Sequence, residues 1–324
     1  TGEALKLADA IGDEEIRADV LVTRGACLVN VGASTEGLRL MEEAIAIVGG
    51  RGPVAGRGYT NLGVALGAMG DLRRQLATFE VGLARAEREG DESMIWFTRG
   101  NLASALYGAG RWDEALELVD QLLDAPDAFQ YMAWSGRFTR AYIHDARGAG
   151  ADALVDVEWA VAHARELDDA QTLIPALVSE SFFFGRHGDP ARADRALEEA
   201  VGLLHDSEAM GDPQDWQVEL VMALDRADRP GVAGELTERL PDVPWRDACR
   251  AIVRRDYEVA ADVLGSLGDA PLEAIARLTA GRALATDGRL AEAETQLELA
   301  RAFWRSVGAT AFLREADEVL ARAS

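Results

Sequence analysis

Apolar residues recur at helical spacing along the whole chain, and glycines interrupt them at nearly regular intervals. The apolar positions hold mostly Ala, Leu and Val, which suits closely packed helices. The alternation of β-branched or aromatic residues with polar ones, which marks a strand, is hard to find. The pattern therefore predicts an all-α protein built from repeated helices.

A repeat emerges when the chain is aligned on the residue that ends each apolar helical run. The eight anchor residues are Gly32, Gly70, Gly110, Gly148, Gly188, Asp228, Arg255 and Gly288. The first six anchors are 38 to 40 residues apart, and the spacing shortens after Asp228. Glycine adopts the left-handed conformation at helix ends without steric cost, so each anchor predicts the end of one helix and the start of its partner.

Small and large residues keep the same phase in these repeats. Seven residues before the anchors stand Gly25, Gly63, Ala103, Ala141, Ser181, Val221, Ala248 and Gly281. Nine residues after them stand Met41, Phe79, Val119, Val157, Leu197, Thr237, Leu264 and Leu297. Small residues where two helices cross, with a bulky one a turn away, are what antiparallel pairs need for close approach. We therefore expect each repeat to be a tightly packed helix pair.

The repeats predict a right-handed α-α superhelix of about eight helix pairs over residues 1–324. Repeats within 1–206 are regular, those within 207–268 are irregular and contain prolines, and 269–324 holds the final repeat and a capping helix at 311–323. Proline ends helices, so we expect a bend or joint near 207–245. Residues 4–13 match 83–91, the tail of a second helix, which indicates the carboxy-terminal piece of a longer protein.

The acidity of the chain limits its partners. It has 33 Lys and Arg against 56 Asp and Glu, a formal charge of −23. Such a surface repels phosphate, so nucleic acid and anionic membranes are not expected partners. Cys27 and Cys249 lie in apolar helical stretches, where we expect both to pack as small hydrophobes. With no disulfide pattern and no long apolar run, a cytoplasmic location is expected.

The repeat resembles the tetratricopeptide repeat at two places, Asn61-Leu62-Gly63 through Gly70-Asp71 to Phe79, and Asn101-Leu102-Ala103 through Gly110-Arg111-Trp112 to Ala115. The period departs from the 34 residues of that family and is similar to the helical arrays of large bacterial signalling ATPases. The stretch from Ala291 to Thr310, with Arg314-Glu315-Ala316, resembles the end of actinobacterial adenylate/guanylate cyclases fused to an AAA-type ATPase. This resemblance implies a regulatory arm, and it carries no cyclase or ATPase residue onto this chain.

Patterns that would indicate catalysis are weak. A phosphate-binding Gly-x-x-x-x-Gly-Lys-Ser/Thr loop is absent from the sequence, and the glycine-rich stretch 50–55 follows a helix rather than a strand. The four histidines do not have metal-ligand spacing. Acidic pairs such as Asp168-Asp169 fall in turns or on exposed faces. We expect no catalytic residue, no cofactor and no metal.

The candidate binding residues lie on first helices, which line the concave surface of such arrays. Asn61 and Asn101 stand where tetratricopeptide clamps place a peptide-binding asparagine, but Thr60, Val64, Gly100 and Ser104 do not match the rest of a carboxylate clamp. Aromatic residues concentrate between Trp96 and Phe184, and they either fill the stack or form a groove. The concave-face candidates are Asn61, Phe97, Asn101, Ser104, Tyr107, Phe138, Tyr142 and Phe182.

Two functions remain open at this point. The first is a non-catalytic arm of a multidomain signalling protein, binding a protein or peptide partner or other domains of the same polypeptide. The second is a sensor in which a small-molecule effector sits inside the superhelix and controls an attached ATPase or cyclase. An open, extended groove would favour the first, and an enclosed pocket with convergent polar groups would favour the second.

Overall fold

The computed structural model describes residues 2–124, 132–167, 169–206 and 215–323, and in this part of the chain every regular element is a helix. The helices are α1 (Gly2–Ile11), α2 (Glu14–Asn30), α3 (Ser34–Ile47), α4 (Gly52–Ala68), α5 (Leu72–Glu89), α6 (Glu92–Gly108), α7 (Trp112–Leu123), α8 (Ala133–Ala146), α9 (Gly150–Leu167), α10 (Ala170–Arg186), α11 (Pro190–Asp206), α12 (Asp215–Arg226), α13 (Pro230–Arg239), α14 (Pro244–Val253), α15 (Tyr257–Leu267), α16 (Ala270–Thr286), α17 (Leu290–Val307) and α18 (Thr310–Ala323).

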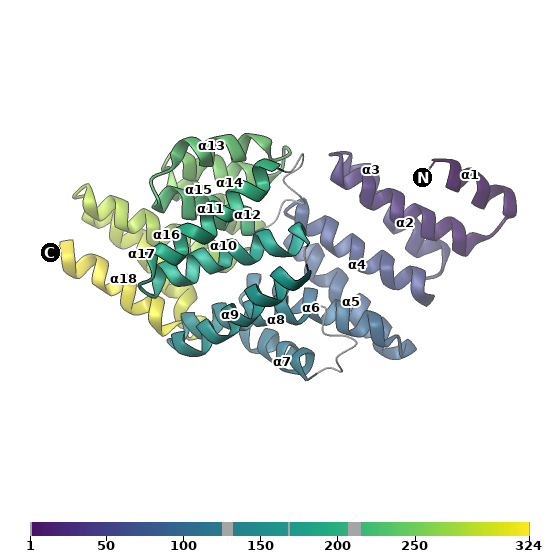
Figure 1. Cartoon of the computed structure of the whole chain (residues 1–324), viewed down its shortest axis with the longest axis horizontal. Helices are drawn as coiled ribbons and strands as arrows, with labels where there is room; N and C mark the ends of the chain where they lie inside the picture. The colour runs from purple at the N-terminus through teal and green to yellow at the C-terminus, as the bar shows by residue number, and fades with distance from the viewer. Residues whose placement is uncertain (1, 125–131, 168, 207–214, 324) are drawn as a thin grey trace.

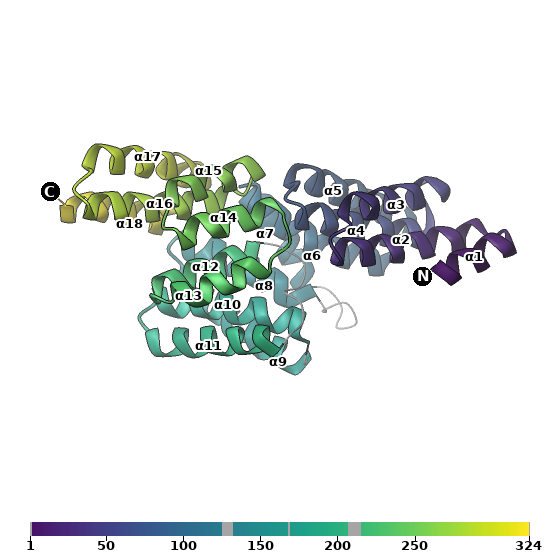
Figure 2. The ribbon, with the colours of Figure 1, turned by 90° about the horizontal axis from the view of Figure 1, so that it is seen from above.

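These helices form a right-handed superhelix of antiparallel pairs, as predicted (Figure 1). Helices α2–α3 through α16–α17 make eight consecutive pairs, α18 caps the last pair, and α1 packs on α2 as a lone second helix. The even-numbered helices form an inner row, in which α2 packs on α4, α4 on α6, α6 on α8, α10 on α12, α12 on α14 and α16 on α18, and the Tyr142 ring joins α8 to α10. Seen from above, α1–α3 project from one side of a more compact body (Figure 2).

The anchor residues have the backbone conformation that the sequence predicts. All eight have positive φ, including the two without a glycine, Asp228 at 53° and Arg255 at 60°. After each anchor, the next residue donates its N–H to a carbonyl five residues back, as from Asp71 to Leu66 (2.9 Å) and from Asp256 to Ala251 (2.9 Å). This is the hydrogen bond of a Schellman cap, so the same helix ending recurs in all eight repeats.

Small residues bring the two helices of each pair into close contact. A Cβ atom added at Gly63 would lie 2.3 Å from Cε1 of Phe79, and one added at Gly281 would lie 2.7 Å from Leu297. Gly25 and Gly37 approach so closely that each Cβ would meet the other's carbonyl oxygen at 2.6–2.7 Å. The residue seven before an anchor therefore packs on the residue nine after it, which confirms the predicted crossing.

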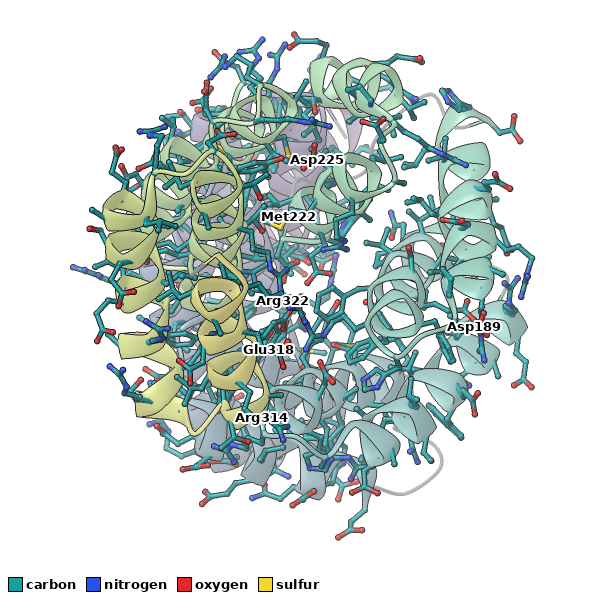
Figure 3. All side chains as sticks on the ribbon, turned by 90° about the vertical axis from the view of Figure 1, so that its left-hand side faces the viewer. Asp189, Met222, Asp225, Arg314, Glu318 and Arg322 are labelled. Carbon is teal, nitrogen blue, oxygen red and sulfur yellow. The ribbon has the colours of Figure 1, made fainter. Side chains whose placement is uncertain are left out.

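The superhelix completes a turn and closes on itself. Helix α16 packs against α6, and α18 packs against α8. The buried indole of Trp245 on α14 donates from Nε1 to the carbonyl oxygen of Gly67 on α4 at 2.8 Å, across 178 residues of sequence. Viewed along the long axis, the helices surround a central opening (Figure 3). We call this contact between α4–α8 and α14–α18 the seam.

The seam continues along the carboxy-terminal helices. Arg147 donates from Nε to the carbonyl oxygen of Val307 at 3.1 Å, and Thr310 donates from its hydroxyl to the carbonyl oxygen of Arg147 at 2.9 Å. Edge-to-face contact between Trp112 and Phe303, with ring centroids 5.7 Å apart, adds apolar surface. Hydrogen bonds and apolar packing together hold the two ends of the turn against each other.

Some sequence expectations need correction or lie outside the described residues. Cys249 is buried as expected, but Cys27 is exposed, because α2 has only the short α1 on its outer side. Helix α12 packs on both α10 and α14, so the inner row continues through the proline-containing segment. Pro213, Phe129, Tyr131 and Asp168 lie outside the described residues, and a bend at 207–214 stays a prediction. None of the described helices is long and apolar enough to span a bilayer.

The close helix crossing predicts opposite effects of the same substitution at two glycines. Gly63→Ala should lower the free energy of unfolding by about 1–3 kcal/mol, because the new methyl group overlaps the Phe79 ring. Gly202→Ala, within α11 and with nothing within 4 Å of its Cβ, should raise it by about 0.5–1 kcal/mol through helix propensity. Urea titration measures both, and equal effects would contradict the proposed crossing.

The seam predicts a second pair of outcomes. Trp245→Phe removes the donor to Gly67 and should cost about 1–2 kcal/mol of stability, with an increase in the radius of gyration measured by small-angle scattering. Trp304→Phe removes a comparably buried indole that stacks on Phe312 within the last repeat. This control should lose stability without expanding the molecule.

Candidate functional site: the central hollow

Closure of the superhelix leaves an interior hollow with two pockets. The first pocket, of about 680 Å³, lies between α4–α6 and the stretch from α14 to the start of α16. The second pocket, of about 700 Å³, lies between α10–α12, α16 and α18. Helix α12 contributes Asp215 to the first pocket and Arg226 to the second, and Asp269, which lines the first pocket, directly precedes α16, which lines the second. The two pockets therefore follow one another along the same pair of helices.

The first pocket has an acidic wall. Asp215, the first residue of α12, and Asp269, the residue before α16, face the pocket beside Trp245. Asn101 and Ser104 of α6 line the opposite part. Asn101 donates from Nδ2 to the carbonyl oxygen of Phe97 at 3.0 Å, so its own amide oxygen remains as an acceptor.

Two tyrosines and a glutamate come together where α6, α8, α10 and α12 meet. Tyr142 on α8 donates from its hydroxyl to Oε2 of Glu219 on α12 at 2.6 Å, and it lies 3.1 Å from the hydroxyl of Ser179. The Tyr107 ring lies 5.7 Å from the Tyr142 ring, and Phe182 lies 5.4 Å from it. These contacts hold the glutamate in place, and of this group only Phe182 lines a pocket.

The carboxyl groups of this region favour their neutral forms. Burial, with Asp215 nearby, raises the pKa of Glu219 to about 8. Burial and the same neighbour raise the pKa of Asp269 to about 8, although its hydrogen bond from the Leu272 N–H opposes this. Burial also raises the pKa of Asp215. Burial of three mutually repelling carboxyl groups explains these shifts, and for Glu219 the charge of Arg226 opposes the rise only in part.

The second pocket is more basic. Its charged lining consists of Arg186, Asp194, Arg226, Arg282, Glu315, Glu318 and Arg322. Glu315 accepts hydrogen bonds from both Arg186 (2.9 Å) and Arg282. Arg322 pairs with Glu318 at 2.8 Å, and both lie on α18 beside the opening seen in Figure 3. Four guanidinium groups meet three carboxylates here, in a chain with a net charge of −23.

The structure separates the candidate residues of the sequence into groups. Asn101 and Ser104 line the first pocket, and Phe182 lines the second. Tyr107 and Tyr142 line neither pocket and pack on each other in the group around Glu219. Neither pocket is lined by Asn61 or Phe97, and Phe138 is buried in the core against Trp134. Asn61 and Asn101 share a repeat position but differ in placement, because α4 reaches the hollow only with its carboxy-terminal end.

Sequence reasoning missed the charged residues of the hollow. Asp215, Glu219 and Arg226 lie on α12, and Asp269 precedes α16, both in repeats where the register seemed weakest. One signal was present: Glu219 and Arg226 are seven residues apart and enclose the buried run Leu220–Leu224. Two charges of opposite sign on one face of an otherwise apolar inner helix point to a polar interior.

The carboxyl groups do not form a metal site. Among the described residues, no group of three or more His, Cys, Asp or Glu side chains could hold a metal ion. The polar groups of the hollow are instead spread along its length, which suits an extended organic ligand with several polar groups.

The raised pKa values predict that the unliganded protein loses stability as pH rises. Glu219 and Asp269 keep their protons up to about pH 8 when folded, whereas the unfolded groups lose them near their ordinary values of 4.5 and 3.8. The folded state thus binds more protons between these limits, and unfolding free energy falls between pH 5.5 and 8. Each group contributes at most about 1.4 kcal/mol per pH unit.

Variants identify the source of this slope. Glu219→Gln should flatten the decline in chemical denaturation measured from pH 5.5 to 8. Glu36→Gln is the control, because hydrogen bonding to Arg39 lowers the pKa of Glu36 and its titration lies below this window. An unchanged slope in Glu219→Gln would show that this carboxyl group does not bear the shift.

Comparisons with known proteins agree with the fold. The tetratricopeptide repeat family matches residues 98–125, which hold most of α6 and all of α7. No curated protein matches the chain. The solved structure of a Rap protein complexed with competence and sporulation factor is similar over 90% of this chain and 99% of that one, with a TM-score of 0.66 and 11% identity. The apo form of the quorum sensor NprR from B. thuringiensis is similar over 93% of this chain and 81% of that one, with a TM-score of 0.54 and 11% identity. The chain therefore has the fold of the tetratricopeptide-like solenoids.

Proposed function

We propose that this protein is a non-catalytic receptor that binds a short peptide in its central hollow. The observation that carries the proposal is the partly enclosed interior, in which two pockets follow one another along α12 and α16. A partly enclosed space with polar groups from α6, α12 and α16 excludes most of a folded partner but admits a flexible chain. The receptor would thus combine the two functions that the sequence left open.

The length of the hollow supports a peptide rather than a single small effector. Asp215 and Arg226 stand at opposite ends of α12, eleven residues apart. At a helical rise of about 1.5 Å per residue, they are about 16 Å apart along the helix. An extended chain covers about 3.3 Å per residue, so about five residues span this length. A small effector would fill only one of the two pockets.

The solved relatives support a receptor as well. The Rap protein in the solved structure is complexed with competence and sporulation factor, and NprR is a quorum sensor. We extend ligand binding from these proteins to this chain as a proposal, because the fold is shared and the identity is low. The resemblance to actinobacterial cyclase and ATPase proteins supports a further step, in which the receptor is the regulatory arm of a multidomain signalling protein.

Binding in the hollow provides a physical route for such regulation. The first pocket is lined by α4–α6 from one end of the superhelical turn and by Trp245 and the 265–269 segment from the other. A ligand in this pocket contacts both sides of the seam and stabilises the closed form. Domains attached to either end would experience this change as a shift in the distance between the ends.

A binding experiment tests the proposed function. The full chain is screened by thermal shift against a pooled library of unmodified pentapeptides and, separately, against free amino acids and dipeptides. We expect a subset of pentapeptides to raise the melting temperature more than the shorter compounds do. A response to single amino acids alone would favour a small-effector sensor, and a response to neither would overturn the receptor.

A variant that fills the pocket locates the binding. Ser104→Leu places a larger side chain in the first pocket from α6 and should abolish the shift. Thr295→Leu makes a comparable change on the exposed face of α17 and should leave the shift intact. Carboxyl groups with raised pKa values also serve as general acids, so turnover of a bound peptide that depends on Glu219 would contradict a purely binding role.

A further inference from the structure

Arg226 lines the second pocket and forms no ion pair or hydrogen bond with any described residue. It lies at the last position of α12, where its side chain is exposed to the hollow. No described carboxylate or carbonyl oxygen accepts a hydrogen bond from it, and its contact is with the Phe182 ring, 5.7 Å from the guanidinium carbon. Burial inside the fold lowers the pKa of Arg226, and the nearby Arg186 and Arg282 contribute to that effect.

The other arginines of the same pocket are already satisfied. Arg186 pairs with Asp145 and Glu315, both at 2.9 Å, and Arg282 pairs with Glu315 as well. Arg322 pairs with Glu318. Among these four arginines, only Arg226 has no ion pair with a described residue, so its guanidinium is available to an anionic group of a ligand in the pocket.

The end of the hollow opposite Arg226 carries carboxyl groups, at Asp215 and Asp269, and Glu219 lies between the two ends, where it feels the charge of Arg226 as well as that of Asp215. None of these three carboxyl groups has an ion-pair partner among the described residues. Helix capping explains why an aspartate stands at position 269, since Asp269 accepts a hydrogen bond from the Leu272 N–H at the start of α16. It does not explain Glu219, which lies within α12 and has the Tyr142 hydroxyl as its hydrogen-bond donor.

The charged groups at the two ends of the hollow are opposite in sign to the two termini of a peptide. We propose that the ligand is a linear peptide of about five residues with free termini, whose carboxylate pairs with Arg226 and whose amino group, or a basic side chain next to it, lies among Asp215, Glu219 and Asp269. This inference rests on the proposed function and adds the ligand's direction and the chemistry of its ends. The peptide then runs parallel to α12, with its amine at the amino-terminal end of the helix and its carboxylate at the carboxy-terminal end.

A carboxylate fits the Arg226 end better than a phosphate does. One unpaired guanidinium balances one negative charge, and the surrounding Glu315 and Glu318 repel a second. The guanidinium also presents two parallel N–H donors, which match the two oxygens of a carboxylate. The pocket thus favours a singly charged planar group.

Blocked peptides test this assignment directly. The full chain is immobilised and offered degenerate pentapeptide libraries in three forms, with free termini, with an amidated carboxyl terminus and with an acetylated amino terminus, and retained peptides are quantified by mass spectrometry. We expect the amidated library to be retained at least about tenfold less than the free one, as for the loss of one charged hydrogen-bond pair. The acetylated library should also be retained less.

Variants at the two ends assign each preference to its residue. Arg226→Met should remove the preference for the free carboxylate, and Arg226→Lys should restore part of it. Arg322→Met is the matched control, because Arg322 lines the same pocket but is paired with Glu318, and it should keep the preference. Glu219→Gln should weaken the preference for the free amine without changing that for the free carboxylate.

The outcomes separate the inference from the function on which it rests. Equal retention of free and amidated peptides would overturn the role of Arg226 while leaving a peptide receptor in place. Loss of the carboxylate preference in Arg322→Met as strongly as in Arg226→Met would likewise overturn it. Retention of none of the libraries would overturn the receptor itself, and the inference with it.

Discussion

The close approach of two helices within each repeat is the constraint on which the rest of the structure depends. Where Gly63 meets Phe79, or Gly25 meets Gly37, no space remains for another methyl group. Such contacts fix the distance and the crossing angle of each pair. A small, constant rotation from one pair to the next then accumulates along the inner row of helices. Eight repeats of this rotation bring α14–α18 back against α4–α8.

The hollow and its chemistry follow from this return. An open stack would expose Asp269 and Arg226 to bulk solvent on opposite parts of a concave surface. In the closed turn, the same residues lie in an enclosed space where charges are poorly screened and pKa values shift strongly. The fold thereby converts ordinary charged side chains at helix ends into a polarised interior. The acidic outer surface surrounds an interior in which one end carries an unpaired cation.

The sequence predicted the local structure far better than the site. The phase of small residues located every helix ending, including Asp228 and Arg255, because the left-handed turn and the helix crossing are short-range requirements. Closure could not be predicted, since it depends on many small rotations whose sum no single residue reveals. Of the aromatic and asparagine candidates, Asn101 and Phe182 line the pockets, and their part in binding stays a prediction. The charges of α12 were missed because their importance arises only when α16 and α18 lie opposite them.

The seam also changes how the repeats depend on one another. In most helical arrays each unit touches only its immediate neighbours, so stability is a sum of local terms and the ends can fray separately. Here the hydrogen bond between Trp245 and Gly67 joins units 178 positions apart. The repeats from α4 to α18 are thus linked as members of a ring, in which opening one link weakens all the others. Helices α1–α3 lie outside that ring and pack on it only through α4.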